Sequence, residues 1–554
     1  MKKITVNKRY WLLPVVALAA FGIATTTIKE DNKYFEISKN IEIFTNLYKE
    51  INTFYVDDLD PSKIMRTGID AMLESLDPYT NYISEAEIEG FTMTVRGKYS
   101  GIGATINRNP GDIYPFVTNP YEGFPAQKAG IKAGDFLLEV DGKSTKGKST
   151  NDISEILRGA TGSGIELKLK RPITNKEYTV NVTRGEVKIP NVPYYGMLND
   201  EVGYLTLTTF TEDAGKNVAN AVRELKKNTG LKGIVFDLRG NGGGLLIEAV
   251  NVSNVFIGKN ELVAATRGKV KDRDKNFSTL NAPVDLDIPV TVLIDEGSAS
   301  ASEIVSGVLQ DLDRAVLVGQ KSYGKGLVQN TRDVGFNSRV KMTIAKYYIP
   351  SGRCIQAVSY KDGEPIEIPD SLKAKFKTRN GRMVYDGGGI YPDVKIKGPA
   401  KAAGITVLLR KNLIFDYATQ YFYKNPSIAD AKSFSLTDAD YDDFVKFVQE
   451  SGKYTYSTKS EKALKNLESK AKKENYLGEI QGEINAMKQK MVTDKSNDLR
   501  KYKKEIKDLL EREVASRYYY VQGKIQVSLK NDEEVAKAIE VLQNTSQYKS
   551  LLQK

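Results

Sequence analysis

Between residues 186 and 400, apolar runs typical of buried strands alternate with segments of helical periodicity. The runs are VGYLTLTTF, GIVFDL, PVTVLID and AVLVG, and we expect helices near 212–228, 245–257 and 301–311. This alternation requires right-handed crossovers and predicts a largely parallel sheet that is buried on both faces. Ligands bind such sheets at the carboxyl ends of the strands. The stretches that follow strands here are RGNGGG (239–244), EGSASAS (296–302) and QKSYGKG (320–326), and they are where we look for chemistry.

The remainder of the chain has a different character on either side of this segment. At 554 residues it is long enough for about three or four domains. Residues 32–90 have helical spacing, and residues 91–185 alternate short β-rich runs with Gly-rich turns, which predicts a small β-rich module with one or two helices. Residues 401–554 are rich in Lys and Glu with helical periodicity. We expect a solvated helical appendage there, with a dedicated binding surface as the alternative.

Residues 1–31 contain a basic stretch, then about fourteen apolar residues, then small and polar ones. This build predicts an exported protein, either periplasmic or anchored to the inner membrane and facing the periplasm. No convincing A-x-A cleavage site is present, so a signal peptide and a retained N-terminal anchor both stay open. No cysteine follows the apolar run, which excludes a lipid anchor there. The net charge of +11 suits an anionic membrane surface but is too diffuse to indicate a nucleic-acid partner.

Two absences restrict the chemistry. The chain has no histidine, which excludes a Ser-His-Asp triad, a Cys-His dyad and any histidine-bound metal. Its single cysteine, Cys354, excludes an internal disulfide and a cysteine-rich zinc site. We expect no metal and no cofactor, and a hydrolase built from this sequence needs a base other than histidine.

Three candidate groups follow the predicted strands. Lys325 lies between two glycines, which lets it approach another backbone, and burial can bring its pKa down into the range of a general base. Gly243 and Gly244 can direct backbone N–H groups at an oxyanion. Ser300 precedes a predicted helix whose dipole favours an alkoxide, and its own N–H can join the glycines. Taken singly, these features also fit a solvent-facing lysine, a tight turn and a helix N-cap.

Together the motifs resemble those of the C-terminal processing peptidases, also called tail-specific proteases. The matching segments occur in the family's order over roughly residues 70–395: LDPYTNYIS, YSGIGATI, AQKAGIKAGDFLLEVDG, DLRGNGGG, EGSASASE, GQKSYGKGLVQ, YYIPSGRCIQ and GGGIYPDV. The resemblance implies a multidomain α/β chain in which a crotonase-like protease core carries an inserted PDZ domain. It also implies a nucleophile at Ser300, with Ser298 and Ser302 as turn and packing residues.

The resemblance implies roles for further positions. Lys325 matches the general base and Gln329 the glutamine that orients it. Gly244 and the Ser300 amide match the oxyanion hole, with Gly243 a less certain neighbour. Glu303 matches a supporting polar position beside the nucleophile. Tyr79 stands where relatives often carry histidine, so no catalytic role is expected for it.

The module at 91–185 resembles a PDZ domain, in which a loop and strand take up the C-terminus of a partner. Gly101, Ile102 and Gly103 are the candidates for its carboxylate-binding loop, and structural turn glycines are the alternative. The expected partners are proteins with unstructured, apolar C-terminal tails. An adaptor protein, homo-oligomerisation and membrane association through the N-terminus are left open.

Two other functions fit parts of the sequence. One is a non-catalytic PDZ scaffold on a degenerate protease core, against which the intact Ser300, Lys325 and Gln329 argue. The other is a crotonase relative that uses acyl-CoA, since glycine amides that stabilise an oxyanion would serve it too. The preferred reading is an exported serine endopeptidase.

Overall fold

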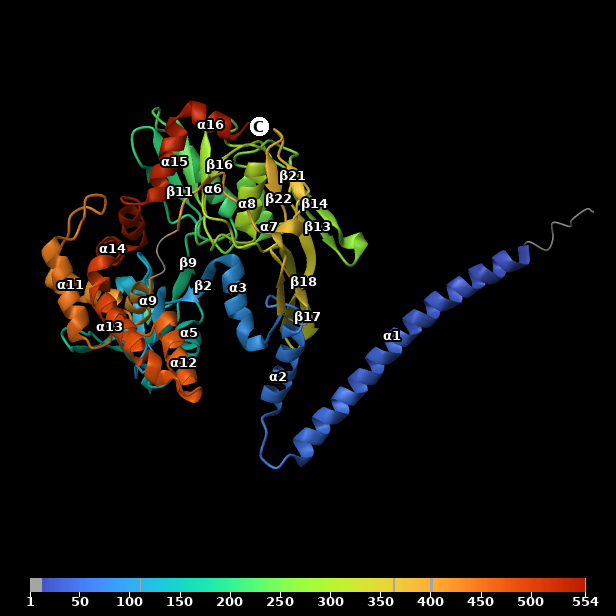
Figure 1. Ribbon diagram of the computed structural model, residues 1–554, viewed down its shortest axis with the longest axis horizontal. Helices are drawn as coiled ribbons and strands as arrows, with labels where there is room; N and C mark the ends of the chain where they lie inside the picture. The colour runs from blue at the N-terminus through green and yellow to red at the C-terminus, as the bar shows by residue number, and fades with distance from the viewer. Residues whose placement is uncertain (1–11, 110, 362–363, 399–401, 554) are drawn as a thin grey trace, which may run out of the picture. The chain divides into compact units, whose positions relative to one another are not determined.

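The computed structural model describes residues 12–109, 111–361, 364–398 and 402–553. The chain divides into two compact units, one of residues 1–82 with 360–364, the other of residues 83–359 with 365–554. The first unit contains helices α1 (Leu12–Phe54) and α2 (Pro61–Glu74) (Figure 1). The Asp60 side chain accepts a hydrogen bond from the Lys63 N–H, and a proline occupies the first position of α2, which explains where this helix begins.

The predicted N-terminal signal falls partly on residues 1–11, which lie outside the described residues. The remainder of it forms the beginning of α1. Among the helices of the described residues, none is both long enough and apolar enough to cross a membrane.

The second unit is built on a sheet with strand order β10-β11-β12-β15-β16-β23. Every neighbouring pair from β11 to β23 is parallel, and only β10 runs antiparallel to its neighbour. This confirms the sheet expected from the alternation of strands and helices. The bounds are β10 (Tyr194–Met197), β11 (Val202–Thr206), β12 (Gly233–Asp237), β15 (Val290–Ile294), β16 (Val316–Gly319) and β23 (Val394–Lys395).

Both faces of this sheet are covered by helices. Leu205, Phe236 and Val292 point into a core shared with the crossover helices α6 (Ala214–Leu225), α7 (Leu246–Ser253) and α8 (Ala301–Asp311). Val235 and Leu293, which alternate with them along the strands, pack on the opposite face against α15 (Glu533–Gln543) and α16 (Thr545–Leu551). Figure 1 shows α15 and α16 beside β11 and β16. The sheet is therefore buried on both faces, and the helices that cover one of these faces are α15 and α16.

A second sheet, which is antiparallel, is built around the long hairpin of β17 (Leu327–Gly335) and β18 (Ser338–Tyr348). Phe336 and Asn337 form the hairpin turn, both with positive φ, as a two-residue turn of this kind requires. β18 also pairs with β13 (Leu262–Gly268), which pairs with β14 (Lys275–Ser278). The residues after Lys325 lead directly into this sheet, since β17 begins at Leu327.

The β-rich module has a sheet with strand order β3-β4-β5-β7-β8, with β6 paired to β5. Its core contains apolar side chains from these strands and from helices α4 and α5. The Ser149 and Asp152 capping box fixes the beginning of α5. β2 pairs with β9 where the chain enters and leaves the module. The bounds are β2 (Lys98–Gly101), β3 (Ala104–Asn107), β4 (Phe116–Pro120), α4 (Pro125–Lys128), β5 (Phe136–Val140), β6 (Lys143–Ser144), α5 (Thr150–Leu157), β7 (Gly164–Lys170), β8 (Glu177–Thr183) and β9 (Gly185–Lys188).

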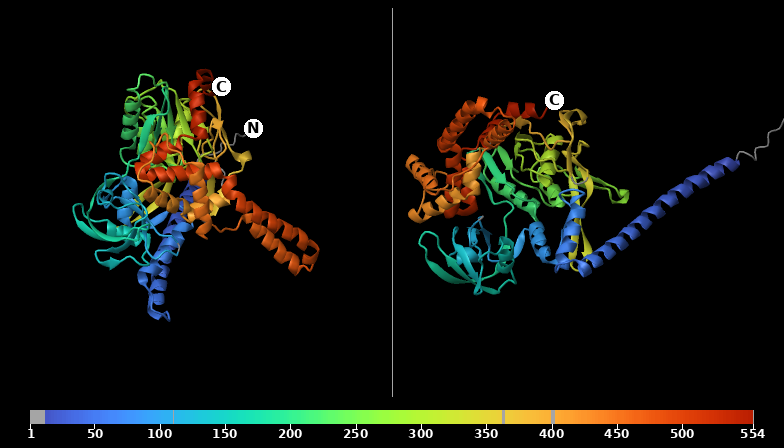
Figure 2. Two further views of the ribbon diagram at one scale, coloured as in Figure 1. Left: turned by 90° about the vertical axis from the view of Figure 1, so that its left-hand side faces the viewer. Right: turned by 60° about the horizontal axis from the view of Figure 1, so that its bottom comes forward.

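The C-terminal region corrects the expectation of a solvated appendage. It has a hydrophobic core of its own, to which α9, α10, α11 and α14 contribute, and α15 is part of the core beneath the parallel sheet. Only α12 and α13 form a mostly exposed antiparallel pair (Figure 2). The Lys and Glu content suggested a solvated appendage because these residues lie on the exposed faces of the helices. It gives no information about the buried faces. The bounds are α9 (Ala403–Arg410), α10 (Leu413–Lys424), α11 (Asp438–Glu450), α12 (Lys459–Lys473), α13 (Leu477–Lys501) and α14 (Lys503–Ser528).

The shorter elements are β1 (Asn81–Ile83), α3 (Ile88–Arg96), β19 (Val358–Lys361), β20 (Glu364–Glu367), β21 (Lys375–Lys377) and β22 (Met383–Tyr385).

Candidate active site

Ser300 stands at the sharp turn between β15 and α8, where it is the N-cap residue of the helix. Its backbone has φ 56° and ψ −112°, a conformation that a residue with a side chain rarely adopts. A strained strand-to-helix turn of this type is how α/β hydrolases present a nucleophilic serine. Ser300 is partly exposed, whereas Ser298 and Ser302 are fully buried.

The two buried serines hold the turn in place. The Ser298 hydroxyl donates to the carbonyl of Leu238 at 2.9 Å, and the Ser302 hydroxyl donates to the carbonyl of Asn241 at 2.8 Å. Both acceptors belong to the stretch that leads into the glycine run. The two serines are packing residues, as expected, and they hold the turn at Ser300 against the glycine loop.

The glycine loop lies directly against Ser300. A Cβ on Gly243 would come within 2.7 Å of the Ala299 carbonyl oxygen and 2.9 Å of the Ser300 Cβ, so only glycine fits. The Gly243 N–H donates to the Asn241 Oδ1 at 2.9 Å and is therefore engaged within its own loop. Asn241 also accepts from the Ala299 N–H at 3.0 Å through its carbonyl. Asn241 thus links the two loops, and sequence reasoning did not single it out.

Gly244 forms a parallel bridge with Phe210. The bonds of this bridge use the carbonyl of Gly243 and the N–H of Leu245, so the N–H of Gly244 itself is directed away from Phe210. Within the described part of the chain no hydrogen bond of that N–H is found. Gly244 and Ser300 line the same cavity.

Lys325 lies on the loop that follows β16. Each flanking glycine is required by a close approach: a Cβ on Gly324 would be 2.4 Å from the Ala357 Cβ, and one on Gly326 would be 2.7 Å from the Gln356 N. The Lys325 backbone is held from both sides, because its N–H donates to Glu303 at 2.9 Å and its carbonyl accepts from the Tyr347 hydroxyl at 2.5 Å. The loop is therefore fixed to the helix that begins at Ser300.

Glu303 was expected only in a supporting role, but its carboxylate binds four groups from the two loops of the site. Its Oε2 accepts the N–H of Ser300 at 2.8 Å and the N–H of Lys325 at 2.9 Å. Its Oε1 accepts the Ser322 hydroxyl at 2.5 Å and the Gly324 N–H at 2.7 Å. The side chain is completely buried, and burial raises the pKa of Glu303 to about 7 against the opposing effect of these hydrogen bonds.

The Ser300 amide was expected in the oxyanion hole, and here it donates to Glu303.

Tyr347, like Asn241, is a residue of the site that sequence reasoning missed. Its hydroxyl lies 3.1 Å from the Ser300 carbonyl oxygen and 2.5 Å from that of Lys325. Burial raises the pKa of Tyr347 well above its ordinary value, so the phenol stays protonated. The signal was present in the motif YYIPSGRCIQ, but nothing in that motif says which tyrosine faces the site.

A cavity of about 440 Å³ opens in front of Ser300. Gln329 lies in its wall, where the Gln329 Nε2 donates to the Thr343 Oγ1 at 3.1 Å. The cavity is of the size that small-ligand and side-chain sites have in enzymes. Much of its lining is apolar, from Phe91, Val95, Phe210, Leu245, Leu246, Ile304 and Leu327.

The candidate carboxylate loop of the β-rich module does not line this cavity. The Ile102 carbonyl accepts from the Ala126 N–H at 2.7 Å, and Gly103 has φ +74°. The backbone N–H groups of Gly103 and Ala104 lower the pKa of the Tyr99 phenol, but burial outweighs them and raises this pKa to about 12. A ligand carboxylate at this loop would replace that phenol oxygen.

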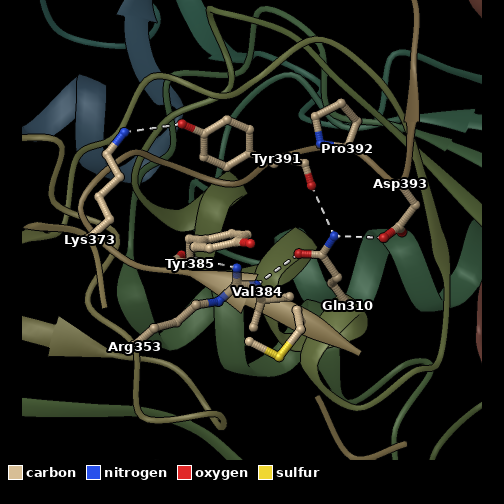
Figure 3. Close-up of a pocket in the computed structure, with 9 residues that line it drawn as sticks. Gln310, Arg353, Lys373, Val384, Tyr385, Tyr391, Pro392 and Asp393 are labelled. Carbon is tan, nitrogen blue, oxygen red and sulfur yellow. Dashed lines mark hydrogen bonds between the residues drawn. The ribbon is translucent and has the colours of Figure 1, made fainter. Parts of the chain in front are cut away.

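The far end of α8 borders a separate cavity of about 480 Å³ (Figure 3). Gln310 donates to the Tyr391 carbonyl and to Asp393, both at 2.9 Å, and accepts from Arg353 at 2.8 Å. Arg353 also pairs with Asp311 at 2.8 Å. These contacts fix the C-terminal end of the helix that carries Ser300 at its other end. Among the described residues, no three His, Cys, Asp or Glu side chains gather to hold a metal ion.

Comparison with known proteins assigns the family. The model of peptidase family S41 matches residues 201–364, the PDZ domain model matches 116–171, and the model of the probable PDZ-protease C-terminal helical domain matches 405–542. The carboxy-terminal-processing protease of Bartonella bacilliformis is 34% identical over 364 residues, which are 65% of this chain and 81% of the relative. The carboxy-terminal processing protease CtpA of Bacillus subtilis is 31% identical over 388 residues, 70% of this chain and 79% of the relative.

Among solved structures, the photosystem II D1 C-terminal processing protease matches with 27% identity and a TM-score of 0.35, over 64% of this chain and 92% of its own. The relatives at 31% and 34% identity are covered over most of their length. From these matches, the chain belongs to the carboxy-terminal processing proteases of peptidase family S41, a family of serine proteases, and it contains a PDZ domain.

Proposed function

We propose that this protein is an exported endopeptidase in which Ser300 is the nucleophile and Lys325 the general base. The observation that carries the proposal is the strained backbone of Ser300 at the mouth of a cavity, with Glu303 bonded to the backbones of both residues. A serine with a lysine base is a known variant of the catalytic triad and needs no histidine.

In the proposed reaction the Ser300 Oγ attacks the carbonyl carbon of the scissile peptide while its proton passes to the neutral Lys325 amine. The tetrahedral intermediate collapses with cleavage of the C–N bond, and Lys325 returns the proton to the departing amine. Water then repeats the sequence on the acyl-enzyme, which releases the acid and restores the Ser300 hydroxyl. Lysine suits this role because its pKa can be lowered by its surroundings, which is not so for arginine.

The oxyanion needs N–H donors that are not already engaged. In this structure the N–H groups of Ser300 and Gly243 donate to Glu303 and Asn241, which leaves Gly244 as the donor on the cavity wall. The N-terminal end of α8 adds positive potential at the same place. We assign Gly244 as the principal oxyanion donor, with Ser300 and Gly243 joining only after their bonds rearrange. Gln329 is assigned as the residue that orients Lys325.

The substrates are proposed to be proteins with unstructured, apolar C-terminal tails, which the PDZ domain takes up by strand addition at Gly101, Ile102 and Gly103. The apolar lining of the Ser300 cavity supports apolar side chains next to the scissile bond. The basic and apolar N-terminal residues support export to the periplasm, with or without a retained anchor. A crotonase-like fold is proposed for the core, supported by its parallel sheet with crossover helices.

The test is cleavage of a fluorogenic peptide with an apolar, free C-terminus by the wild type, Ser300→Ala and Lys325→Arg. Lys325→Arg keeps a long basic side chain but stays protonated, so it cannot act as a base near neutral pH. Both variants should melt like the wild type and lose cleavage, and mass spectrometry should detect the acyl adduct on Ser300 in the wild type alone. Near-normal turnover by either variant would refute the assignment. Peptide binding without cleavage by the wild type under all conditions would favour a PDZ scaffold.

A further inference from the structure

The N-terminal end of α15 contacts the beginning of the glycine loop. Arg239, the third residue of DLRGNGGG, donates from its Nη1 to Asp532 at 3.0 Å and to Glu534 at 2.5 Å. It also pairs with Asp237 at the end of β12, at 2.6 Å. The side chains of Arg239, Asp532 and Glu534 are between 11% and 19% exposed, so these are ion pairs largely removed from solvent.

The same end of α15 contacts the beginning of the lysine loop. The Glu534 Oε2 accepts from Arg239, while its Oε1 accepts from the Nε2 of Gln320. Gln320 is the first residue after β16, five positions before Lys325. One carboxylate therefore bonds to both loops on which the proposed chemistry depends, one carrying Gly244 and the other Lys325.

The rest of α15 is anchored firmly. Val535, Ala538 and Val541 are buried in the core on one face of the parallel sheet, in contact with residues of β12, β15 and β16. Asp532 caps the helix by accepting the N–H groups of Glu534 and Val535. The position of the two carboxylates is thus set by the sheet whose strand ends support both loops.

Asp532 and Glu534 are both needed to balance the charge of Arg239. A cation beside the positive end of a helix is unfavourable unless anions stand between them. Burial alone would lower the pKa of Arg239, but Asp237, Asp532 and Glu534 outweigh it and raise the pKa well above its ordinary value. Burial raises the pKa of Glu534, and the contacts to Arg239 and Gln320 oppose that rise. Neutralising the acids would leave Arg239 paired with Asp237 alone.

We infer that α15 is a positioning element of the active site, in which Asp532 and Glu534 hold the glycine loop through Arg239 and the lysine loop through Gln320. The inference rests on the proposed function, which gives the two loops their roles. It gives the C-terminal helical region a task in the catalytic step that is separate from its packing. A helix that covered the sheet but lacked Asp532 and Glu534 would therefore not replace α15.

The test uses three variants of the full chain: Asp532→Asn, Glu534→Gln and the double variant. Asparagine is as good an N-cap as aspartate, and glutamine has nearly the shape of glutamate, so helix and packing are retained while the charges on Arg239 are removed. Glu533→Gln is the matched control. It removes one charge from the same helical turn, but Glu533 is exposed, and within the described ranges its one ion pair is with the exposed Lys504.

The readouts are kcat and KM for the fluorogenic peptide, the melting temperature and amide hydrogen exchange. In the double variant we expect kcat to fall by about 10- to 100-fold while KM stays close to that of the wild type, as small displacements of catalytic groups produce. Peptides covering 239–245 and 320–326 should exchange faster in the double variant and at the wild-type rate in Glu533→Gln.

The outcomes separate the two claims. If the wild type cleaves, Ser300→Ala does not, and the double variant matches Glu533→Gln in kcat and exchange, the inference is overturned while the proposed function stands. A parallel fall of activity and melting temperature without faster exchange in the two loops would also overturn it, because that pattern reflects packing alone. If the wild type and Ser300→Ala are equally inactive, the proposed function fails, and the exchange rates still test whether α15 holds the loops.

Discussion

The N–H of Ser300 donates to the Oε2 of Glu303 at 2.8 Å, three residues further along α8. Because the same carboxylate binds the Lys325 N–H, the backbones of the proposed nucleophile and base are held by one side chain. Above its pKa of about 7, Glu303 is ionised and acceptor-only, and all four of its partners are donors. A carboxylate is the side chain that satisfies this arrangement.

Glu303→Gln should therefore disrupt the site although it conserves shape. Glutamine presents an NH₂ group to two of the donors, so those partners lose their acceptor in a fully buried position. We expect kcat for peptide cleavage to fall by about 10²-fold, since both loops are displaced together. Steady-state kinetics check this, with Glu296→Gln, an exposed neighbour, as the control. Equal kcat values for the two variants would show that the carboxylate has no positioning role.

The raised pKa of Glu303, about 7, predicts how stability depends on pH. Its ordinary value is 4.5, so between pH 4.5 and 7 the folded protein holds a proton that the unfolded chain has lost. The contribution of Glu303 is thus fully present below pH 4.5 and is lost as the pH rises through 7, by roughly 3 kcal/mol. The melting-temperature difference between the wild type and Glu303→Gln should shrink over this window in calorimetry at a series of pH values. A difference that grows with pH would contradict the prediction.

The glycine run allows a test with a matched pair of substitutions. Gly243 has φ +98° and its Cβ would meet the Ala299 carbonyl oxygen at 2.7 Å, whereas a Cβ on Gly242 would meet nothing within 4 Å. Gly243→Ala must displace the nucleophile turn, and we expect about 10²-fold lower kcat. Gly242→Ala should cleave the peptide as the wild type does. Comparable losses in both variants would mean that the run serves only as a flexible linker.

Much of the protease core could be predicted because its signals are local. Apolar runs such as that of β16, separated by helical segments, leave a buried parallel sheet as the consistent solution, and α8 begins where the serine-rich turn ends. The motifs after the strands also identified the loops that the structure brings together around Ser300. Those features depend on residues that are close to one another along the chain.

Contacts between distant segments were not predictable from the same patterns. Glu534 lies 295 residues from Arg239, and nothing in the sequence around Glu534 distinguishes it from an ordinary surface charge. Tyr347 likewise lies 47 residues from Ser300 along the chain, and only the fold brings its hydroxyl to the Ser300 carbonyl. The C-terminal region was misjudged for the same reason: composition reports the average of a helix, whereas Val541 and Leu542 are buried by a sheet formed far earlier in the chain.

Tyr99 offers a test of the PDZ loop. The Gly103 and Ala104 N–H groups interact with its phenol oxygen and lower its pKa, and a ligand carboxylate would need the same N–H groups. Tyr99→Phe removes that competitor, so a peptide with a free C-terminus should bind more tightly by about 1 kcal/mol, or several-fold in Kd. Fluorescence anisotropy with Ser300→Ala as the background measures the binding.

Two controls accompany the Tyr99 experiment. The C-terminally amidated peptide should gain nothing from Tyr99→Phe, because it carries no carboxylate. Tyr114→Phe removes a half-buried phenol from the same module and should leave the Kd of both peptides unchanged. An equal effect of the two tyrosine substitutions would rule out Gly103 and Ala104 as the carboxylate site.

The hydroxyl of Tyr347 should contribute to catalysis through the backbone alone. It lies between the carbonyl oxygens of Ser300 and Lys325, and a phenol can give its one proton to only one of them at a time. Tyr347→Phe keeps the buried ring but leaves both carbonyls without this donor, at a cost of about 1–3 kcal/mol. We expect a lower melting temperature and a kcat reduced by about tenfold, with KM little changed, because the aromatic ring that lines the cavity is kept while the two loops lose their shared donor. The control is Tyr348→Phe, which changes the next residue on β18 and should keep the wild-type kcat. If Tyr347→Phe and Tyr348→Phe have the same kcat, the two loops are held together without the Tyr347 hydroxyl.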